Sequence, residues 1–338
     1  MRTGLRSPSA RPEAPIKNAI RLQLALWGIR IFHVERVMLA CWVVLCGAGL
    51  AAAGPLQVAA LHPLLADLAR QVGGERVEVY NLAGEGGNLH RFEPRPADLQ
   101  RMQASALVLA SGKNLEPYLG RLKSSLGGVT VVEVGRTIPS LTVRAGAADH
   151  GGVSHEEHGA HGAGSLDPHW WHGVDNMRRA ARVVAKALAE KDPAGADYFM
   201  ERSNAYGRRL DALKSWADAE LWKIPREQRK LVTAHNAFGY FAREFGFEVI
   251  AVAGLNQEQN TTPQEQAETL TAVKNAGVRA VFPEKSTSGK VLDSIATTLG
   301  VRLGEPLIAD GNGTGKDAGF EAMIRHNVTS ITQALSAP

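Results

Sequence analysis

The stretch PLQVAALHPLLADLARQVGGERVEVYNLA, residues 55–83, places two short apolar runs on either side of a segment with helical periodicity. Residues 55–61 and 76–83 have the length and composition of strands, and residues 64–73 repeat their apolar side chains at helical spacing. A strand, a helix and a second strand in this order predict the beginning of a parallel sheet covered by helices.

The same alternation continues along the chain. Further strands are expected at 106–112, 128–134, 230–234, 247–254 and 278–284, and further helices at 95–105, 174–192, 237–246, 262–277, 291–300 and 319–336. Between the two series, residues 194–224 keep helical periodicity, which would give a helix about 45 Å long. We therefore predict an α/β protein of two lobes, 54–193 and 225–338, each a mostly parallel sheet with covering helices, joined by the linker helix 194–224.

The first 53 residues differ from the rest. They hold seven basic and two acidic residues and end in the uncharged stretch 37–54, in which Ala51 and Ala53 have the spacing of a signal-peptidase site. We expect an export signal that is cleaved near Ala53. An uncleaved membrane anchor, a lipoprotein modified at Cys46 and a translation start near Met38 are the alternatives, ranked below cleavage.

Removal of this leader changes the composition. The whole chain has 38 Lys and Arg against 34 Asp and Glu, a net charge of +4, whereas residues 54–338 carry 31 basic and 32 acidic residues and no Cys. The excess positive charge therefore lies in the leader, and a nucleic-acid partner is not expected. Without thiols, a metal site would have to use His and carboxylates.

Motifs for catalysis are missing from the sequence. No G-x-S-x-G nucleophile motif is present, and Leu89 stands where the dinucleotide motif G-x-G-x-x-G needs its last Gly. The sequence thus gives no sign of covalent catalysis. Whether the protein binds a ligand or acts as an enzyme depends on the candidate metal site: four protein ligands would leave no open position for a substrate or an activated water, which favours a binding protein.

Four potential ligands follow predicted strands or precede predicted helices. They are His90, His169, His235 and Asp310, two from each predicted lobe. Ligands in open α/β sheets gather at the carboxyl ends of the strands, so these four side chains are candidates for one metal site. Asn236 has the residue type of a helix N-cap.

The residues around these four positions carry a resemblance. GGNLHRFEPRP (86–96), DPHWW (167–171), TAHNAFGYF (233–241) and GEPLIAD (304–310) resemble, in order, the metal-site segments of the zinc/manganese ABC-transporter solute-binding proteins of the ZnuA/TroA type (cluster A-I). The resemblance implies a metal site in the cleft between the two lobes, held by His90, His169, His235 and Asp310. His at position 235, where manganese members tend to have Glu, points to the zinc type.

Other side chains receive secondary roles. Glu284 and Asn236 are expected to contact the ligands, although Glu284 could equally be a solvated strand end, and His172 is expected to be structural or to support a ligand. Glu305 is the alternative carboxylate to Asp310, because both precede the Gly-rich residues 311–319.

A His-rich segment interrupts the first lobe. Residues 148–162 include His150, His155, His158 and His161 and have neither strand nor helix periodicity. The segment is either a solvated linker or, as the resemblance implies, a weaker auxiliary zinc site that collects Zn²⁺ or docks a periplasmic metallochaperone.

The resemblance implies a periplasmic protein, expected to be a monomer, that captures one Zn²⁺ ion with high affinity and delivers it to an ABC permease and its ATPase. Three imidazoles and one carboxylate suit four-coordinate Zn²⁺, whereas Mn²⁺ prefers more oxygen ligands. A receptor for manganese or another divalent metal is the alternative within the family. The alternative from another class is a zinc hydrolase with Asp310 as general base.

Overall fold

The computed structural model describes residues 54–84, 89–142, 165–253, 263–285, 287–311, 313–315 and 318–336. The leader 1–53 and the His-rich residues 148–162 lie outside these ranges. No helix among the described residues has both the length and the apolar character needed to cross a membrane.

The first lobe contains a parallel sheet. Its strands are β1 (Leu56–Ala60), β2 (Val77–Asn81), β3 (Leu107–Ala110) and β4 (Thr130–Glu133), in the order β2-β1-β3-β4. Val58 of β1 pairs with Val79 on one side and Leu107 on the other. Every residue of β3 is buried, as expected for a central strand with helices on both faces.

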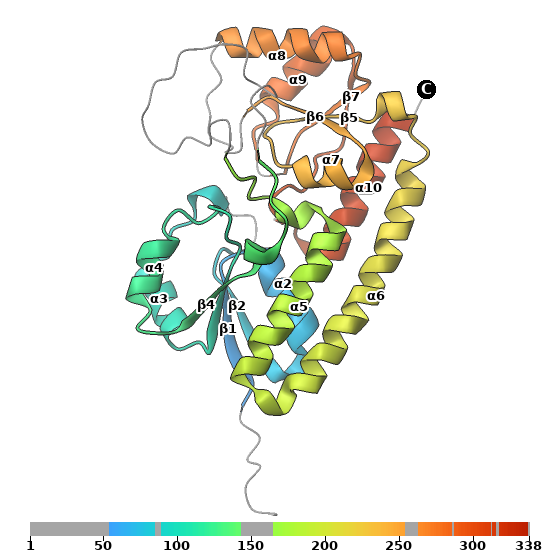
Figure 1. The fold of residues 1–338 in the computed structure, drawn as a ribbon. Helices are drawn as coiled ribbons and strands as arrows, with labels where there is room; N and C mark the ends of the chain where they lie inside the picture. The colour runs from blue at the N-terminus through green and yellow to red at the C-terminus, as the bar shows by residue number, and fades with distance from the viewer. Residues whose placement is uncertain are drawn as a thin grey trace, which may run out of the picture. The chain divides into compact units, whose positions relative to one another are not determined.

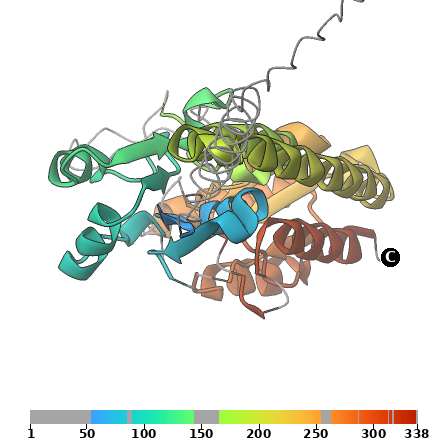
Figure 2. The same cartoon turned by 90° about the horizontal axis from the view of Figure 1, so that it is seen from below.

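Two pairs of helices cover this sheet (Figures 1 and 2). The helices α3 (Pro96–Gln103) and α4 (Leu119–Ser125) cover one face, and α2 (Pro63–Gly73) and α5 (Val174–Lys191) cover the other. His62 caps α2, because its Nδ1 accepts a hydrogen bond of 3.0 Å from the Leu64 amide, and Pro63 occupies the first turn.

The second lobe repeats the plan. Its strands are β5 (Lys230–Thr233), β6 (Glu248–Ala251), β7 (Ala280–Phe282) and β8 (Arg302–Leu303), all parallel, in the order β6-β5-β7-β8. One face packs on α8 (Pro263–Ala276) and α9 (Lys290–Leu299), and the other on α7 (Gly239–Phe245) and α10 (Phe320–Ser336). The prediction of two parallel-sheet α/β lobes is confirmed.

The long helix α6 (Ala196–Leu221) joins the lobes. It packs on α2 and α5 of the first lobe and on α10 of the second (Figure 1). Its buried residues include Phe199, Tyr206, Leu213 and Leu221, and they belong to the largest apolar core, which continues from one lobe into the other. This shared core makes Pro55–Pro338 one compact unit rather than two separate ones.

One helix and one helix start differ from the sequence analysis. The helix α4 was not predicted, because only two of its residues, Leu119 and Leu122, are buried and give it an apolar face. The helix α7 begins at Gly239 with Phe238 as N-cap, so the expected N-cap at Asn236 is wrong. The Thr233 hydroxyl and the Ala237 amide both donate to the His235 carbonyl, at 2.8 and 3.0 Å, and this turn delays the helix.

Candidate metal centre

Four loops at the carboxyl ends of the strands bring the candidate ligands together. His90 lies in a 3-10 turn (Leu89–Arg91) after β2, and His169 precedes another (Trp170–His172). His235 lies two residues after β5, and Asp310 lies between β8 and α10. The loops of His90 and His235 begin directly where parallel strands end, and His169 and Asp310 reach the same region from longer connections after β4 and β8.

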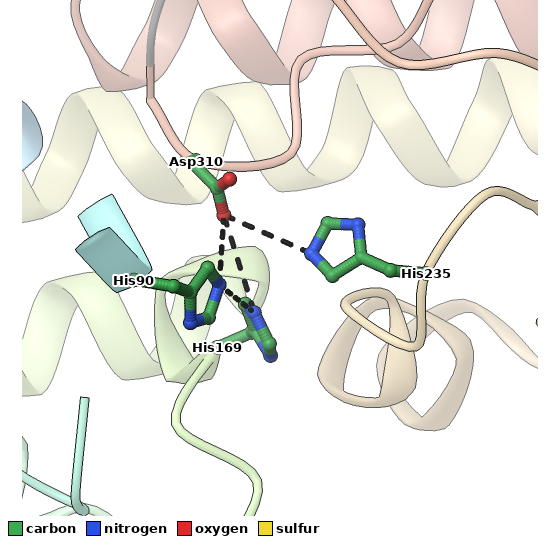
Figure 3. Close-up of side chains that lie close together, drawn as sticks. All are labelled: His90, His169, His235 and Asp310. Carbon is green, nitrogen blue, oxygen red and sulfur yellow. Dashed lines mark hydrogen bonds and ion pairs between the residues drawn. The ribbon is translucent and has the colours of Figure 1, made fainter. Parts of the chain in front are cut away.

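The ligand atoms of these residues face one another (Figure 3). The Nε2 atoms of His90 and His169 are 3.3 Å apart. Asp310 Oδ1 lies 3.9 Å from His90 Nε2, and 4.0 Å from Nε2 of both His169 and His235. All four atoms lie within 4.8 Å of one another, so the predicted residues form one cluster.

The cluster is closed to solvent. The exposed fraction of the side chains is 6% for His90, 1% for His235 and 0% for His169 and Asp310. Within the described residues, His235 Nε2 makes no hydrogen bond although it is buried. A buried nitrogen in this state costs free energy unless a ligand meets it, which favours a bound cation in the centre.

Glu284 fixes His235. Its Oε2 accepts a hydrogen bond from His235 Nδ1, and its Oε1 accepts one of 3.0 Å from the His235 amide. Since a carboxylate accepts and His235 Nδ1 donates, the Nε2 lone pair is left to face the centre. The same contact outweighs burial, which by itself lowers the pKa of His235, so that the pKa is raised above its ordinary value.

Asp167 does the same for His169. Its Oδ1 accepts hydrogen bonds of 2.9 Å from both the amide and Nδ1 of His169, so Nε2 again faces the centre. The sequence analysis missed this residue. The signal was present in the D-x-H spacing of DPHWW, because a side chain two residues before His169 can reach back to its amide and ring.

The electrostatics of the cluster favour a cation. Burial raises the pKa of Asp310 to about 6, with His235 opposing the shift, and burial raises the pKa of Asp167 to about 7 against its hydrogen bond from the His169 amide. These two carboxyls and Glu284 lie within one region closed to water. A divalent cation there would stabilise their ionised forms.

The distances suit a small four-coordinate ion. Metal–ligand bonds of about 2.0–2.1 Å in a tetrahedron place the ligand atoms roughly 3.3–3.4 Å apart. The two Nε2 atoms of His90 and His169 already have this spacing. The three distances to Asp310 Oδ1 would shorten by about 0.6 Å when an ion of this kind binds.

The other residues considered in the sequence, His172, Glu305 and Asn236, are not part of the cluster. His172 is fully buried outside the cluster, burial lowers its pKa to about 3, and its Nε2 bonds to the Ala309 carbonyl at 2.7 Å. Glu305 is exposed and Asp310 occupies the cluster, so the alternative carboxylate is not needed. Asn236 is half-buried and makes no recorded side-chain hydrogen bond within the described residues. The four His of residues 148–162 lie outside the described ranges.

The fold and this cluster define a two-lobe protein with a buried candidate metal site whose residues come from both lobes. Residues 58–334 match the family described as zinc-uptake complex component A, periplasmic. The chain belongs to this family of solute-binding proteins. It is therefore a metal-binding component of an ABC transporter, which works with a permease and an ATPase, and it is not an enzyme.

Relatives in this family carry different metals in their names. The manganese-binding lipoprotein MntA of Bacillus subtilis (strain 168) is 30% identical over 308 residues, covering 86% of this chain and 94% of the relative. The zinc-binding protein TroA of Treponema pallidum (strain Nichols) is 29% identical over 281 residues, covering 81% and 86%. The iron-binding protein YfeA of Yersinia pestis is 28% identical over 254 residues, covering 75% and 77%.

Solved structures agree with the fold. The periplasmic zinc-binding protein TroA from Treponema pallidum superposes with a TM-score of 0.73 at 27% identity, covering 84% of this chain and all of that one. A crystal structure of ZnuA gives a TM-score of 0.71 at 24% identity, covering 83% and 100%. The predicted family is confirmed, while the relatives leave the metal open.

Proposed function

We propose that the protein is the zinc receptor of an ABC uptake system, with Zn²⁺ as its cargo and His90, His169, His235 and Asp310 as the ligands. The observation that supports this most is the set of facing atoms, three imidazole nitrogens and one carboxylate oxygen within 4.8 Å. A set of nitrogen ligands with a single carboxylate suits tetrahedral Zn²⁺ better than Mn²⁺, which prefers oxygen ligands.

Manganese is the second candidate, because the relative MntA is named for it. For Glu284 to supply Mn²⁺ with a further oxygen ligand, it would have to leave His235, to which it makes two hydrogen bonds. This rearrangement would break a buried charge-assisted pair, and the geometry therefore favours zinc.

The test is metal content and competition. The purified protein, stripped of metal and then given equal Zn²⁺ and Mn²⁺, should retain one Zn²⁺ per chain by elemental analysis. His235→Ala should lose most of it. His326→Ala is the matched control, since His326 bonds to the Pro306 carbonyl away from the cluster. Equal zinc in all three proteins would refute the site, and preferential retention of Mn²⁺ would refute the choice of metal.

Export is a separate proposal. We propose that residues 1–53 are removed near Ala53 and that the protein acts in the periplasm, as the family description states for its members. Several relatives are named lipoproteins, which keeps modification at Cys46 as the alternative. Intact-mass spectrometry of the exported protein distinguishes the two, because a lipid-modified N-terminal Cys46 adds both residues and acyl mass.

The His-rich segment 148–162 is proposed to collect Zn²⁺ weakly or to dock a periplasmic metal donor. The described residues before and after this segment are paired with each other, because Thr142 and Leu166 form an antiparallel bridge. A variant that lacks 148–162 should bind one zinc ion in the cluster but lose the weaker equivalents in a titration. An unchanged titration and unchanged transfer from a donor would show that the segment is only a linker.

A further inference from the structure

Two side chains of one turn hold the carbonyl that precedes Asp310. Trp171 Nε1 donates to the Ala309 carbonyl at 2.8 Å, and His172 Nε2 donates to the same oxygen at 2.7 Å. Trp171, His172 and Ala309 are all buried to within 1%. The carbonyl thus has both lone pairs used, and the peptide that leads into Asp310 has a defined orientation.

The two donors are themselves held in place. The ring of Trp171 packs on His62, with centroids 4.3 Å apart, and His62 caps α2 through the Leu64 amide. The ring of His172 packs on Phe238, with centroids 4.5 Å apart, three residues after His235. Neither donor can turn away from the carbonyl without leaving a packed contact, because buried rings fill most of the space around them.

The same turn supplies a ligand. His169 lies directly before Trp170–His172, and its Nε2 faces Asp310 Oδ1 at 4.0 Å. One segment therefore contains both a candidate ligand and two donors: His169 directs a nitrogen toward the centre, and Trp171 and His172 bond to the carbonyl that precedes Asp310. The spacing between His169 and Asp310 therefore depends on the hydrogen bonds from this segment to Ala309.

The position of the Asp310 carboxylate matters for the geometry. The oxygen Oδ1 faces all three imidazoles, and the other oxygen points away from them (Figure 3). A four-coordinate ion needs one oxygen at this corner of the tetrahedron. Small displacements of a ligand weaken a metal site because bond lengths are fixed within narrow limits.

We propose that Trp171 and His172 are positioning residues for metal binding, which fix Asp310 through the Ala309 carbonyl at the distance that its three imidazole partners require. This inference rests on the proposed role of the four clustered side chains as zinc ligands. In this proposal Trp171 and His172 act through Asp310 and are not ligands themselves. The Trp171 ring also packs on His169, with centroids 5.2 Å apart, and a Phe at position 171 keeps an aromatic ring beside it.

The chain offers a matched control. Trp170 is as buried as Trp171, and its Nε1 donates to Ser111 Oγ at 2.9 Å within the first lobe. Trp171→Phe and Trp170→Phe make the same chemical change, an indole replaced by a smaller phenyl ring without an N–H donor, but only the first removes a bond to Ala309. The Zn²⁺ affinity of the metal-free full chain, measured by competition with a fluorescent chelator, should fall about 3- to 10-fold more in Trp171→Phe than in Trp170→Phe. His172→Phe should behave like Trp171→Phe.

Double variants that also carry Asp310→Asn separate a positioning role from a general destabilisation of the protein. The variant Asp310→Asn lowers zinc affinity by itself. In this background, adding Trp171→Phe should lower the affinity by less than 2-fold more than adding Trp170→Phe does, because Trp171 acts through a ligand that is already lost. Co²⁺ bound to Trp171→Phe should show a visible absorption spectrum shifted toward that of Asp310→Asn, whereas Co²⁺ bound to Trp170→Phe should match the unmodified protein.

The outcomes separate the two proposals. An unmodified protein that binds no zinc would refute the proposed function. If the unmodified protein binds zinc but the two Trp variants lose affinity equally, or if the excess loss persists in the Asp310→Asn background, the positioning role of Trp171 and His172 is overturned and the zinc site stands.

Discussion

Glu284→Gln tests how the cluster holds its ligands. The carboxylate accepts two hydrogen bonds from His235, one from the amide at 3.0 Å and one from Nδ1, and its side chain has no exposed surface. The Gln amide has only one oxygen, so one of the two donors on His235 would face an NH₂ group. His235 would then turn, and its Nε2 would leave the position that faces Asp310.

The size of the effect follows from these contacts. A hydrogen bond to a charged group is worth about 1.5–3 kcal/mol, and loss of a group that orients a metal ligand typically costs about 10- to 100-fold in affinity. These ranges agree, since 10- to 100-fold corresponds to about 1.4–2.7 kcal/mol. We expect zinc affinity to fall 10- to 100-fold in Glu284→Gln.

Chelator competition measures the affinity, and thermal unfolding of the metal-free protein checks the fold. The metal-free variant should be nearly as stable as the unmodified protein, because removal of a buried charge offsets the lost contacts. Glu305→Gln, at an exposed carboxylate of the loop that carries Asp310, is the control. A Glu284→Gln protein that binds zinc within 2-fold of the unmodified protein would refute the orienting role.

Three further predictions concern pH, a loop glycine and a buried carboxyl. Zinc affinity should fall as the pH drops, and the fall should begin above the ordinary His pKa of about 6.5, because Glu284 raises the pKa of His235 and protons compete with zinc there first. Zinc titrations between pH 5.5 and 8 check this, and an affinity that does not change with pH would contradict it. Gly311→Ala should weaken zinc binding and lower the free energy of unfolding by about 1–3 kcal/mol, since φ at Gly311 is +65° and the new Cβ would lie 2.5 Å from Leu64 Cγ. An unchanged melting temperature and zinc affinity would show that the loop accommodates the Cβ without strain. Burial raises the pKa of Glu116 to about 7 from 4.5, so the folded state binds its proton more tightly and stability from this group is lost as the pH rises from about 4.5 to 7, by at most about 3 kcal/mol. Glu116→Gln should remove that slope from denaturant curves, and the same slope in the variant would place its origin elsewhere.

The sequence predicted the elements that have a clear period. The apolar runs that became β1, β3 and β5 and the amphipathic segments that became α2, α5 and α10 were found within a few residues of their bounds. Local hydrophobic spacing decides such elements because one face must be buried in any fold that uses them. The helix α4 was missed because its apolar face consists of only two buried residues, Leu119 and Leu122.

The candidate site was predicted in its ligand set and in part of its surroundings. His90, His169, His235 and Asp310 were found because they follow predicted strands or precede a predicted helix, and the cluster brings them together as expected. Glu284 was expected beside the ligands, whereas Asp167 was missed although the D-x-H spacing indicates it. Trp171 was missed because the position of its partner, the Ala309 carbonyl, depends on the tertiary structure. The expected N-cap at Asn236 failed for a similar reason, because hydrogen bonds to the His235 carbonyl form a turn before α7.

The sequence by itself determined the two α/β series, the helix between them and the four ligand types, because these depend on local spacing and residue chemistry. Only the tertiary structure decided that Glu284 fixes the imidazole of His235 and that Trp171 and His172 hold the carbonyl before Asp310. Trp171 and Ala309, which share one of these hydrogen bonds, are 138 residues apart in the sequence. Hydrogen bonds over such separations have no local signature, because they form only after both lobes have packed on the shared core.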